Sequence, residues 1–339
     1  MSAWIPIDGD TFITRENFIL YVFGYEHPEG RVFSFLKYIP SELKSHFPLR
    51  YLRKRWRLRN IELVRSEKLY TAENFQKLLE TFRSRFPDYV YFCPYRGKEV
   101  ISPSLRLIKK VYVPKDCLQK LLKKKRKDRL QKLALELVTL LSTVSSVPVE
   151  DFGIHGSIAL NMHIMKSDID LVVHGSHNFR SLEGAISKLV GEGTLSYIFT
   201  KRLDRVRKHR GRYKNKIFVY TAVRELEEIT YKYGDYRYCP VKPVTFSCQV
   251  VDDREAMFRP AFYQVTDYQP LDSASELAKD EIPIAVVSMI GMYRNVARRD
   301  EAIRVSGTLE RVESTKDGDV HYHVVVGTGT REDECIWPA

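Results

Sequence analysis

The stretch of sequence that decides the fold is Gly153-Ile-His-Gly-Ser-Ile-Ala-Leu-Asn-Met-His-Ile-Met-Lys-Ser-Asp-Ile-Asp-Leu-Val-Val173. A short strand is predicted over residues 151–155, and Gly156-Ser157 forms a turn that opens a short helix reaching Ile164. A turn of this kind exposes backbone N–H groups and a hydroxyl, which suits the binding of a phosphate group.

Two acids follow this turn on an apolar strand predicted over residues 168–173. Because side chains alternate along a strand, Asp168 and Asp170 share one face and Ile169 points to the other. Mg²⁺ prefers carboxylate ligands together with phosphate oxygens. The pattern predicts that the two acids bind Mg²⁺ or Mn²⁺ and that Gly156 and Ser157 hold a triphosphate. The alternative, acids that merely face solvent, is disfavoured because acids on an apolar strand are costly without partners.

The Gly-Ser turn, the short helix and Ser167-Asp168-Ile169-Asp170-Leu171 resemble the signature of the nucleotidyltransferase superfamily, which includes DNA polymerase beta and the poly(A) and CCA-adding polymerases. This resemblance implies transfer of a nucleoside monophosphate from an NTP to a hydroxyl, with two divalent metal ions clamping the attacking and leaving oxygens. Lys166 and Ser167 complete the expected nucleotide-binding set, although a solvated loop is the simpler interpretation of Lys166.

A weaker resemblance extends over the whole chain. Gly24-Tyr-Glu-His-Pro28, Tyr293-Arg294 and Gly307-Thr-Leu-Glu310 are similar to segments of uncharacterised archaeal predicted nucleotidyltransferases. This similarity implies no particular substrate.

The sequence departs from the superfamily at the third carboxylate, which members usually place on a neighbouring, later strand. The predicted strand 217–220 has no acid, and 244–251 has Ser and Gln where an acid would stand. Asp252 is the expected third carboxylate, with Glu228 and Asp235 as alternatives. Without a third acid the site would bind a metal–nucleotide complex and catalyse poorly.

The fold class expected is α+β, with a central nucleotidyltransferase-like mixed sheet that has helices on one side. The expected domains are an N-terminal α+β domain over 1–115, a nucleotidyltransferase-like domain over 116–270 and a small C-terminal β-rich module over 271–339. Leucines at helical spacing predict one leading helix over 116–145, and the same periodicity predicts a helix over 72–85.

The composition favours a polyanionic partner inside the cell. Lys plus Arg total 55 against 43 for Asp plus Glu, which gives a net charge of +12. Charge of this kind speaks to association and not to fold. The five cysteines form no CxxC pair, so free thiols in a reducing compartment are expected. No signal peptide and no membrane span are recognised, and the expected location is cytoplasmic.

Three basic segments bear on the partner: Arg50–Arg59, Lys120–Lys132 and Lys201–Lys216. Cations bind phosphates without reading sequence, and aromatic residues beside them can stack on unpaired bases. The expected partner is a nucleic acid, RNA rather than DNA, contacted by Arg205, Arg207 and Arg210. A solvated basic surface is the alternative explanation of each segment.

The sequence thus predicts a Mg²⁺-dependent enzyme that transfers NMP from an NTP to a hydroxyl of RNA and releases pyrophosphate. Two alternatives stay open. One is a catalytically weak nucleotidyltransferase-like protein that binds RNA, and the other is an enzyme that nucleotidylates a small molecule or a protein. The NTP, the acceptor and the oligomeric state do not follow from the sequence.

Overall fold

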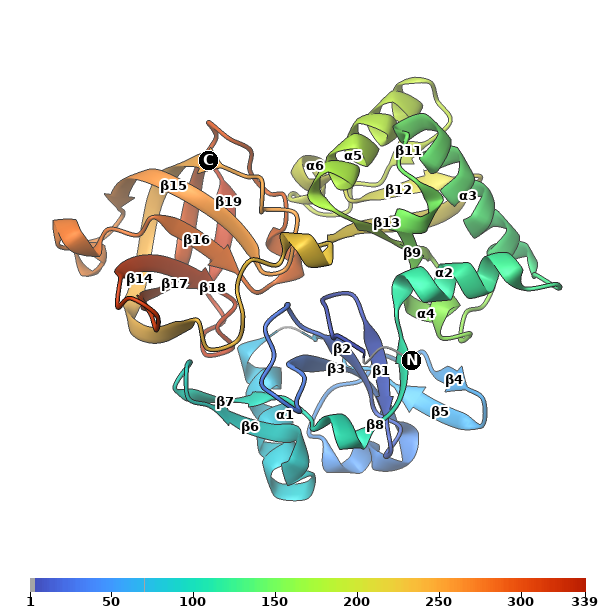
Figure 1. The fold of residues 1–339 in the computed structure, drawn as a ribbon, viewed down its shortest axis with the longest axis horizontal. Helices are drawn as coiled ribbons and strands as arrows, with labels where there is room; N and C mark the ends of the chain where they lie inside the picture. Colours follow the sequence, from blue (N-terminus) through green and yellow to red (C-terminus); the bar gives the residue numbers. More distant parts are fainter. Residues whose placement is uncertain (1–3, 70) are drawn as a thin grey trace.

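The structure is a computed structural model that describes residues 4–69 and 71–339, and three large sheets divide it into three lobes (Figure 1). Figure 1 shows the N-terminal lobe in blue and cyan, the middle lobe in green and yellow, and the C-terminal lobe in orange and red. The protein is a mixed α/β structure whose longer helices lie mainly on the middle lobe. No helix in the described ranges is long and apolar enough to cross a membrane.

The N-terminal lobe is an antiparallel sheet in the order β4-β5-β3-β2-β1-β8. Helix α1 (Ala72–Arg85) packs Leu78, Leu79 and Phe82 into its aromatic core, so the helix predicted over 72–85 is confirmed. A separate hairpin, β6–β7, extends toward the C-terminal lobe (Figure 1). The strands are β1 (Thr11–Thr14), β2 (Ile19–Val22), β3 (Ser34–Pro40), β4 (Trp56–Leu58), β5 (Ile61–Val64), β6 (Val90–Cys93), β7 (Lys98–Ile101) and β8 (Ile108–Tyr112).

The middle lobe is the small mixed sheet that the sequence predicts, in the order β11-β12-β13-β10-β9. Strands β10 and β13 run parallel, and the other neighbours are antiparallel. Helices α3 and α5 pack together over the core of this sheet. The elements are α2 (Pro114–Lys123), α3 (Arg129–Ser145), β9 (Phe152–Ile154), α4 (Gly156–Ala159), β10 (Ile169–His174), α5 (Ser176–Gly191), β11 (Ser196–Tyr197), α6 (Asp204–Arg207), β12 (Arg210–Tyr213) and β13 (Lys216–Val223).

The leading helix expected over 116–145 is two helices, α2 and α3, separated by residues 124–128. Asp128 begins α3 with a capping box: its Oδ1 accepts a hydrogen bond from Gln131 N at 3.0 Å, and Gln131 Oε1 accepts from Asp128 N at 3.3 Å. A capping box satisfies N–H groups at the start of a helix, which have no acceptor in a preceding turn. Asp128 therefore marks the start of a new helix that is separate from α2. The short helix expected to reach Ile164 is likewise only the single turn α4.

The C-terminal lobe is a closed barrel of five strands. Its order is β14-β15-β16-β18-β17, and β14 pairs back onto β17 to close it, while β19 adds to β17 outside the closure. Apolar residues from every strand of the closed barrel fill its interior. The strands are β14 (Tyr236–Asp252), β15 (Ala261–Pro270), β16 (Ala285–Ser288), β17 (Ala302–Ser314), β18 (Val320–Val326) and β19 (Cys335–Pro338).

The boundary between the middle and C-terminal lobes differs from the one expected at residue 270. Strands β14 and β15 belong to the barrel, because Val244, Phe246, Cys248 and Val250 of β14 point into its interior. The middle lobe therefore ends with β13, and a linker over residues 224–235 leads into the barrel. The C-terminal unit is a full β-barrel and not a small module.

Short 3-10 turns connect many of these elements. They are η1 (Ser41–His46), η2 (Pro87–Tyr89), η3 (Leu105–Leu107), η4 (Val149–Asp151), η5 (Leu226–Glu228), η6 (Ser273–Ser275), η7 (Lys279–Glu281) and η8 (Gly291–Tyr293).

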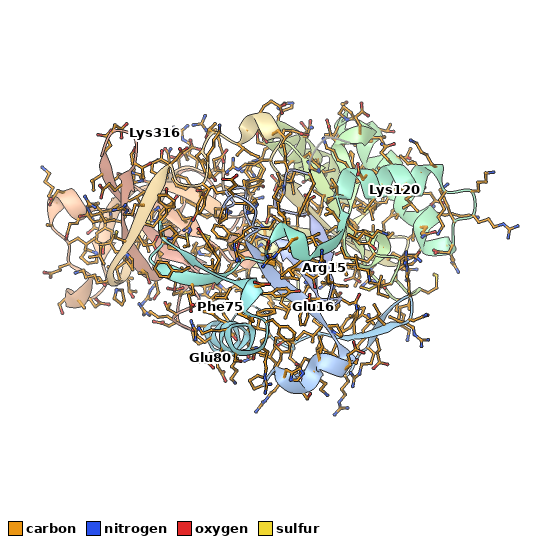
Figure 2. The ribbon with its side chains drawn as sticks, turned by 60° about the horizontal axis from the view of Figure 1, so that its bottom comes forward. Arg15, Glu16, Phe75, Glu80, Lys120 and Lys316 are labelled. Atoms are coloured by element: carbon orange, nitrogen blue, oxygen red, sulfur yellow. The ribbon has the colours of Figure 1, made fainter. Side chains whose placement is uncertain are left out.

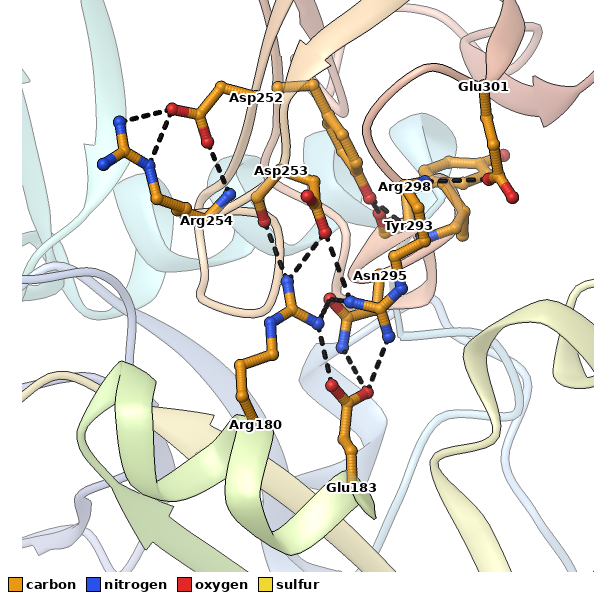
Figure 3. A network of polar contacts seen from close by, with 11 residues as sticks. Arg180, Glu183, Asp252, Asp253, Arg254, Tyr293, Asn295, Arg298 and Glu301 are labelled. Carbon is orange, nitrogen blue, oxygen red and sulfur yellow. Dashed lines mark hydrogen bonds and ion pairs between the residues drawn. The ribbon is translucent and has the colours of Figure 1, made fainter. Parts of the chain in front are cut away.

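A polar network fixes the barrel against the middle lobe (Figure 3). Arg180 and Glu183 of α5 meet Asp253, Asn295 and Arg298, which lie on two loops of the barrel. The Arg180 guanidinium donates to Asp253 Oδ2 at 2.9 Å, and Arg298 donates to Glu183 Oε1 at 2.9 Å. Positive and negative groups from the two lobes alternate in this network. Its ion pairs therefore form only when the lobes are docked in this orientation.

Two buried arginines complete the assembly of the lobes. Arg207 of α6 donates to the backbone oxygens of Arg294 at 3.0 Å and Gly291 at 2.9 Å, both in the β16–β17 connection. Arg259, in the β14–β15 loop, donates through Nε to Asp8 Oδ1 of the N-terminal lobe at 2.7 Å. Each lobe is thus linked to the barrel through charged hydrogen bonds, which are stronger than neutral ones.

Candidate functional site

The predicted motif residues line a cavity of about 350 Å³ where the three lobes meet, here called the interlobe cavity. The middle lobe provides His155, Gly156, Ser157, Lys166, Ser167, Asp168, Asp170, Val172, Thr221 and Val223. The N-terminal lobe provides Asp8, Gly9, Tyr21, Phe35, Lys37, Tyr38, Lys54, Trp56 and Arg65, and the barrel provides Arg259 and Arg294. The structure thus brings together Gly156, Ser157, Lys166, Ser167, Asp168 and Asp170.

The Gly-Ser turn lies directly against the second acid. Gly156 has a φ of +63°, which disfavours side chains, and a Cβ at this position would overlap the carboxylate of Asp170. The neighbouring backbone N–H of His155 donates to the Asp170 backbone oxygen at 2.9 Å. Only glycine therefore allows the turn after β9 to approach the acidic strand this closely.

Asp168 and Asp170 both face the interlobe cavity, while Ile169 is buried in the core of the middle lobe. Burial raises the pKa of Asp170 to about 6, against the opposing effect of the Lys37 ammonium. Asp168 makes an ion pair of 3.4 Å with Arg210. A raised pKa means that the Asp170 carboxylate lacks full compensation by the protein and gains from a cation.

The strand beside Asp170 has no acid on the cavity face. In the parallel pair β10–β13, Val219 lies opposite Asp170 and Thr221 lies opposite Val172. Asp8 lines the cavity but is paired with Arg259. Over residues 4–69 and 71–339, no group of three or more His, Cys, Asp or Glu residues is placed to hold a metal ion.

The three acids proposed from the sequence to complete the site lie elsewhere. Asp252, at the end of β14, accepts a hydrogen bond of 2.8 Å from the Arg254 guanidinium and is not part of the cavity lining. Glu228 accepts from Ser176 N at 2.8 Å and so caps the start of α5. Asp235 pairs with Lys316 at 3.0 Å. The expectation for Asp252 failed because β14 belongs to the barrel and not to the middle sheet.

The two acids fit one Mg²⁺ that also takes phosphate oxygens. Magnesium is commonly held by one or two protein carboxylates, with substrate phosphates and waters as its other ligands. Asp168 and Asp170 provide such a pair, and the buried Nε of Arg65 on the cavity wall has no hydrogen-bond partner among the described residues. An acidic pair with this unsatisfied guanidinium N–H nearby is compatible with a metal–polyphosphate ligand.

The N-terminal lobe contributes the cationic and aromatic wall. Burial, together with the nearby Arg65 guanidinium, lowers the pKa of Lys37 to about 7. Lys37 Nζ lies 5.0 Å from the ring centroid of Tyr21, and Lys54 Nζ lies 5.1 Å from that of Trp56. A bound anion would relieve the repulsion between these cations. Lys54 and Trp56 lie in the first basic segment of the sequence, whereas no sequence pattern indicated Lys37 or Arg65.

The other predicted polar residues have different surroundings. Ser167 is buried, and its hydroxyl accepts a hydrogen bond from Ile164 N at 3.0 Å, while Lys166 is exposed at the cavity rim. His155 lies 3.1 Å from Thr11 Oγ1, and burial lowers its pKa to about 3. His155 is thus a neutral wall residue that joins the middle lobe to β1.

The three arginines expected to contact nucleic acid do not form one surface. Arg205 is exposed, but Arg207 is buried and holds the barrel connection described above. Arg210 lies beside the interlobe cavity and forms an ion pair with Asp168. Arg207 is therefore a structural residue, because its guanidinium is already satisfied by backbone oxygens.

Comparisons with known proteins give one distant relative. The uncharacterized protein MJ1086 of Methanocaldococcus jannaschii is 25% identical in sequence, in an alignment that covers 95% of each chain. No protein-family description matches the chain, and no solved structure matches it.

Proposed function

We propose that the protein is a Mg²⁺-dependent nucleotidyltransferase that moves NMP from an NTP to a hydroxyl acceptor. The observation that carries this proposal is one cavity that joins the Gly156-Ser157 turn, the acids Asp168 and Asp170, and a cationic wall. Six cations (Lys37, Lys54, Arg65, Lys166, Arg259 and Arg294) against three acids (Asp8, Asp168 and Asp170) line it. This balance suits a triphosphate that arrives with a metal ion.

In the proposed reaction the acceptor hydroxyl oxygen bonds to the α-phosphorus and releases its proton to solvent water. The bond from that phosphorus to the bridging oxygen breaks, and pyrophosphate leaves. Asp168 and Asp170 would hold Mg²⁺ or Mn²⁺, which would supply charge neutralisation at the phosphates. The Gly156-Ser157 turn positions the triphosphate, and Lys37 and Arg65 stabilise the charge on the leaving group.

The proposed acceptor is RNA rather than DNA. The β4–β5 hairpin and the α2–α3 connection, which both carry exposed cations, lie on the same side of the molecule (Figure 1). Figure 2 shows Lys120 of α2 and Lys316 of the β17–β18 turn at opposite ends of the molecule. The proposal places the RNA toward the α2 end, because the β4–β5 hairpin and the α2–α3 connection with their exposed cations both lie there.

The test incubates the protein with each labelled NTP, Mg²⁺ or Mn²⁺ and total RNA. We expect Asp168→Asn and Asp170→Asn each to reduce NMP transfer by at least about 100-fold, since each removes a metal ligand. Asp252→Asn is the matched control and should transfer at the wild-type rate, because Asp252 lies outside the cavity. Wild-type rates for both cavity variants, or loss of activity in the control alone, would contradict the proposal.

A second candidate function is nucleotide-dependent RNA binding with little catalysis. Val219 and Thr221, which occupy the cavity face of β13 in place of an acid, favour it. It predicts Mg–NTP binding that depends on Asp170, without incorporation of label into any acceptor. Label that enters a small molecule or a protein instead of RNA would support the third possibility, a different acceptor for the same chemistry.

A further inference from the structure

The barrel has the strand arrangement of an OB fold. Numbered within the barrel, its five strands follow the closed order 1-2-3-5-4-1, and the third and fifth strands, β16 and β18, run parallel. OB barrels bind oligonucleotides or oligosaccharides on the outer face of their second and third strands, together with nearby loops. Fold analogy alone does not show a ligand, so the corresponding face must have the chemistry of a site.

A cavity of about 430 Å³, here called the barrel cavity, borders that face and extends over the outer sides of β14, β17 and β18. Phe262 of β15 and Val287 of β16, which pair directly, lie on its floor, because their neighbours Tyr263 and Val286 point into the barrel. The linker over residues 224–235 forms part of the opposite wall. A volume in this range accommodates a ligand of nucleotide size.

Aromatic rings dominate the lining of the barrel cavity. Tyr236 and His321 lie edge to face with centroids 6.3 Å apart, and Tyr238 stacks on His323 at 5.8 Å. The hydroxyls of Tyr236, Tyr238 and Tyr231 have no hydrogen-bond partner among the described residues, although all three residues line the cavity. Tyr236 and His321, which are partly exposed, thus offer ring surface for stacking with free hydroxyls beside them, whereas His323 is buried and bonded to Glu310.

The charge of the barrel cavity excludes a phosphate as its main ligand. Two arginines, Arg96 and Arg224, line it with three glutamates, Glu26, Glu228 and Glu255. Arg224 is paired with Glu255, and Arg96 lies 4.2 Å from the ring centroid of Tyr238. Unlike the interlobe cavity, this one has no excess of cations. Its chemistry suits an uncharged planar group with a hydrogen-bonding edge.

We propose that the barrel cavity binds a nucleobase of single-stranded nucleic acid by stacking. Stacking on aromatic side chains tolerates any base, and it differs from phosphate contacts in being insensitive to salt. This site is separate from the nucleotide site in the interlobe cavity.

The position of the barrel cavity indicates a role, which rests on the proposed function. Arg224 and Pro260, which line it, directly follow Val223 and Arg259, which line the interlobe cavity. The two cavities therefore share two chain segments as borders. A base held in the barrel cavity would anchor the acceptor strand near the site of transfer.

The test measures binding of a fluorescently labelled single-stranded RNA octamer to the full-length protein at about 50 and about 200 mM salt. We expect Tyr236→Ala and His321→Ala to weaken binding roughly 10- to 100-fold at both salt concentrations, with the slope of log affinity against log salt unchanged. Trp337→Ala, an exposed aromatic of β19 outside this cavity, is the matched control and should bind within about twofold of wild type.

A second measurement uses the wild-type protein, so that the site is tested even if the alanine variants fold poorly. An octamer carrying 5-iodouridine is irradiated with the wild-type protein, and the cross-linked peptides should contain Tyr236, Phe262 or His321. Unchanged affinity in both alanine variants, a changed salt slope, or cross-links elsewhere would overturn the proposal. Displacement of the octamer by a maltooligosaccharide and not by unlabelled RNA would assign the cavity to a sugar instead.

Failure of this inference and failure of the proposed function are separable. If Tyr236→Ala loses octamer binding while the wild-type protein transfers no NMP, the nucleobase site stands and the transfer reaction falls. If Asp170→Asn abolishes transfer while Tyr236→Ala binds the octamer normally, the opposite conclusion holds.

Discussion

Gly156 packs so closely against the Asp170 carboxylate that its backbone has room for a hydrogen atom but not for a Cβ. We expect Gly156→Ala to lower Mg–NTP affinity at least about tenfold and to cost about 1–3 kcal/mol of stability, from the positive φ and the overlap together. Calorimetry with Mg–ATP and urea unfolding measure the two effects.

Gly184 is the matched control for this change. It is an exposed residue of α5 with no atom near its missing Cβ. Gly184→Ala should leave nucleotide affinity unchanged and add up to about 1 kcal/mol of stability, because alanine favours the helix. Equal nucleotide affinity in the two variants would show that the turn does not contact the ligand.

Asp10 gives the protein a pH-dependent stability. Burial raises its pKa from near 3.8 to about 7, although the Trp4 indole N–H donates to its Oδ2 at 2.7 Å. Between about pH 4 and 7 the folded state therefore keeps a proton that the unfolded state has released, so stability falls as pH rises through this window.

Asp10→Asn removes this dependence while keeping an acceptor for Trp4. We expect the variant to unfold at the same urea concentration as wild type near pH 4 and to be more stable by about 1–3 kcal/mol at pH 8. A constant difference between the two proteins across this range would contradict the assigned titration.

The site residues that could be predicted from the sequence lie close to one another in the chain. Gly156, Ser157, Asp168 and Asp170 fall within one strand–turn–strand unit, so spacing and alternation suffice to place them. Lys37, Arg65, Arg259 and Arg294 come from distant segments whose approach depends on how lobes dock. No local pattern encodes that approach, which is why the cationic wall was not predicted.

At the scale of elements, the start of α3 depends on Asp128. This residue caps the helix through Oδ1, and its Oδ2 lies 2.8 Å from His163 Nε2 in the loop that leads to the acidic strand. Asp128→Ala should cost about 1–2 kcal/mol in urea unfolding, because it removes the cap.

Asp128→Ser separates the two roles of this side chain. Serine retains the cap but is too short to reach His163, so we expect it to lose less than about half of the alanine effect. If both variants are destabilised equally, the contact with His163 and not the cap dominates.

Elements whose apolar residues recur at a regular spacing were predicted well. Errors arose where a local capping signal interrupts that spacing. Helix α1 and strand β10 follow from periodicity alone. The leucines before and after residues 124–128 continue one helical pattern, yet Asp128 and Gln131 have the spacing of a capping box and mark a new start. The apolar alternation of β14 was visible in the sequence. Alternation does not identify pairing partners, however, and those of β14 are the barrel strands β15 and β17.

At the scale of the whole molecule, Arg207 joins the middle lobe to the barrel. Arg207→Ala should remove the donor to the Arg294 backbone oxygen and the shorter of two hydrogen bonds to the Gly291 oxygen, and cost about 2–4 kcal/mol. Since Arg294 also lines the interlobe cavity, Mg–NTP affinity should fall as well.

The neighbouring exposed Arg205 provides the control. Arg205→Ala should change stability by no more than about 0.5 kcal/mol and leave nucleotide affinity intact. Thermal unfolding and limited proteolysis between the lobes compare the two variants. Equal melting and proteolysis for both would show that Arg207 does not hold the lobes together.

The delivery of Arg259 and Arg294 by two loops of the barrel has a consequence for protein synthesis. During translation the N-terminal lobe, the turn and the acidic strand emerge before the barrel, and the last wall of the interlobe cavity forms only once the strands that close the barrel have left the ribosome. Strand β14 finds its long partner β17 after about fifty further residues have been made. A nascent or prematurely terminated chain that lacks the barrel therefore has Asp168 and Asp170 without Arg259 and Arg294, and its Mg–NTP affinity should be lower than that of the full-length protein.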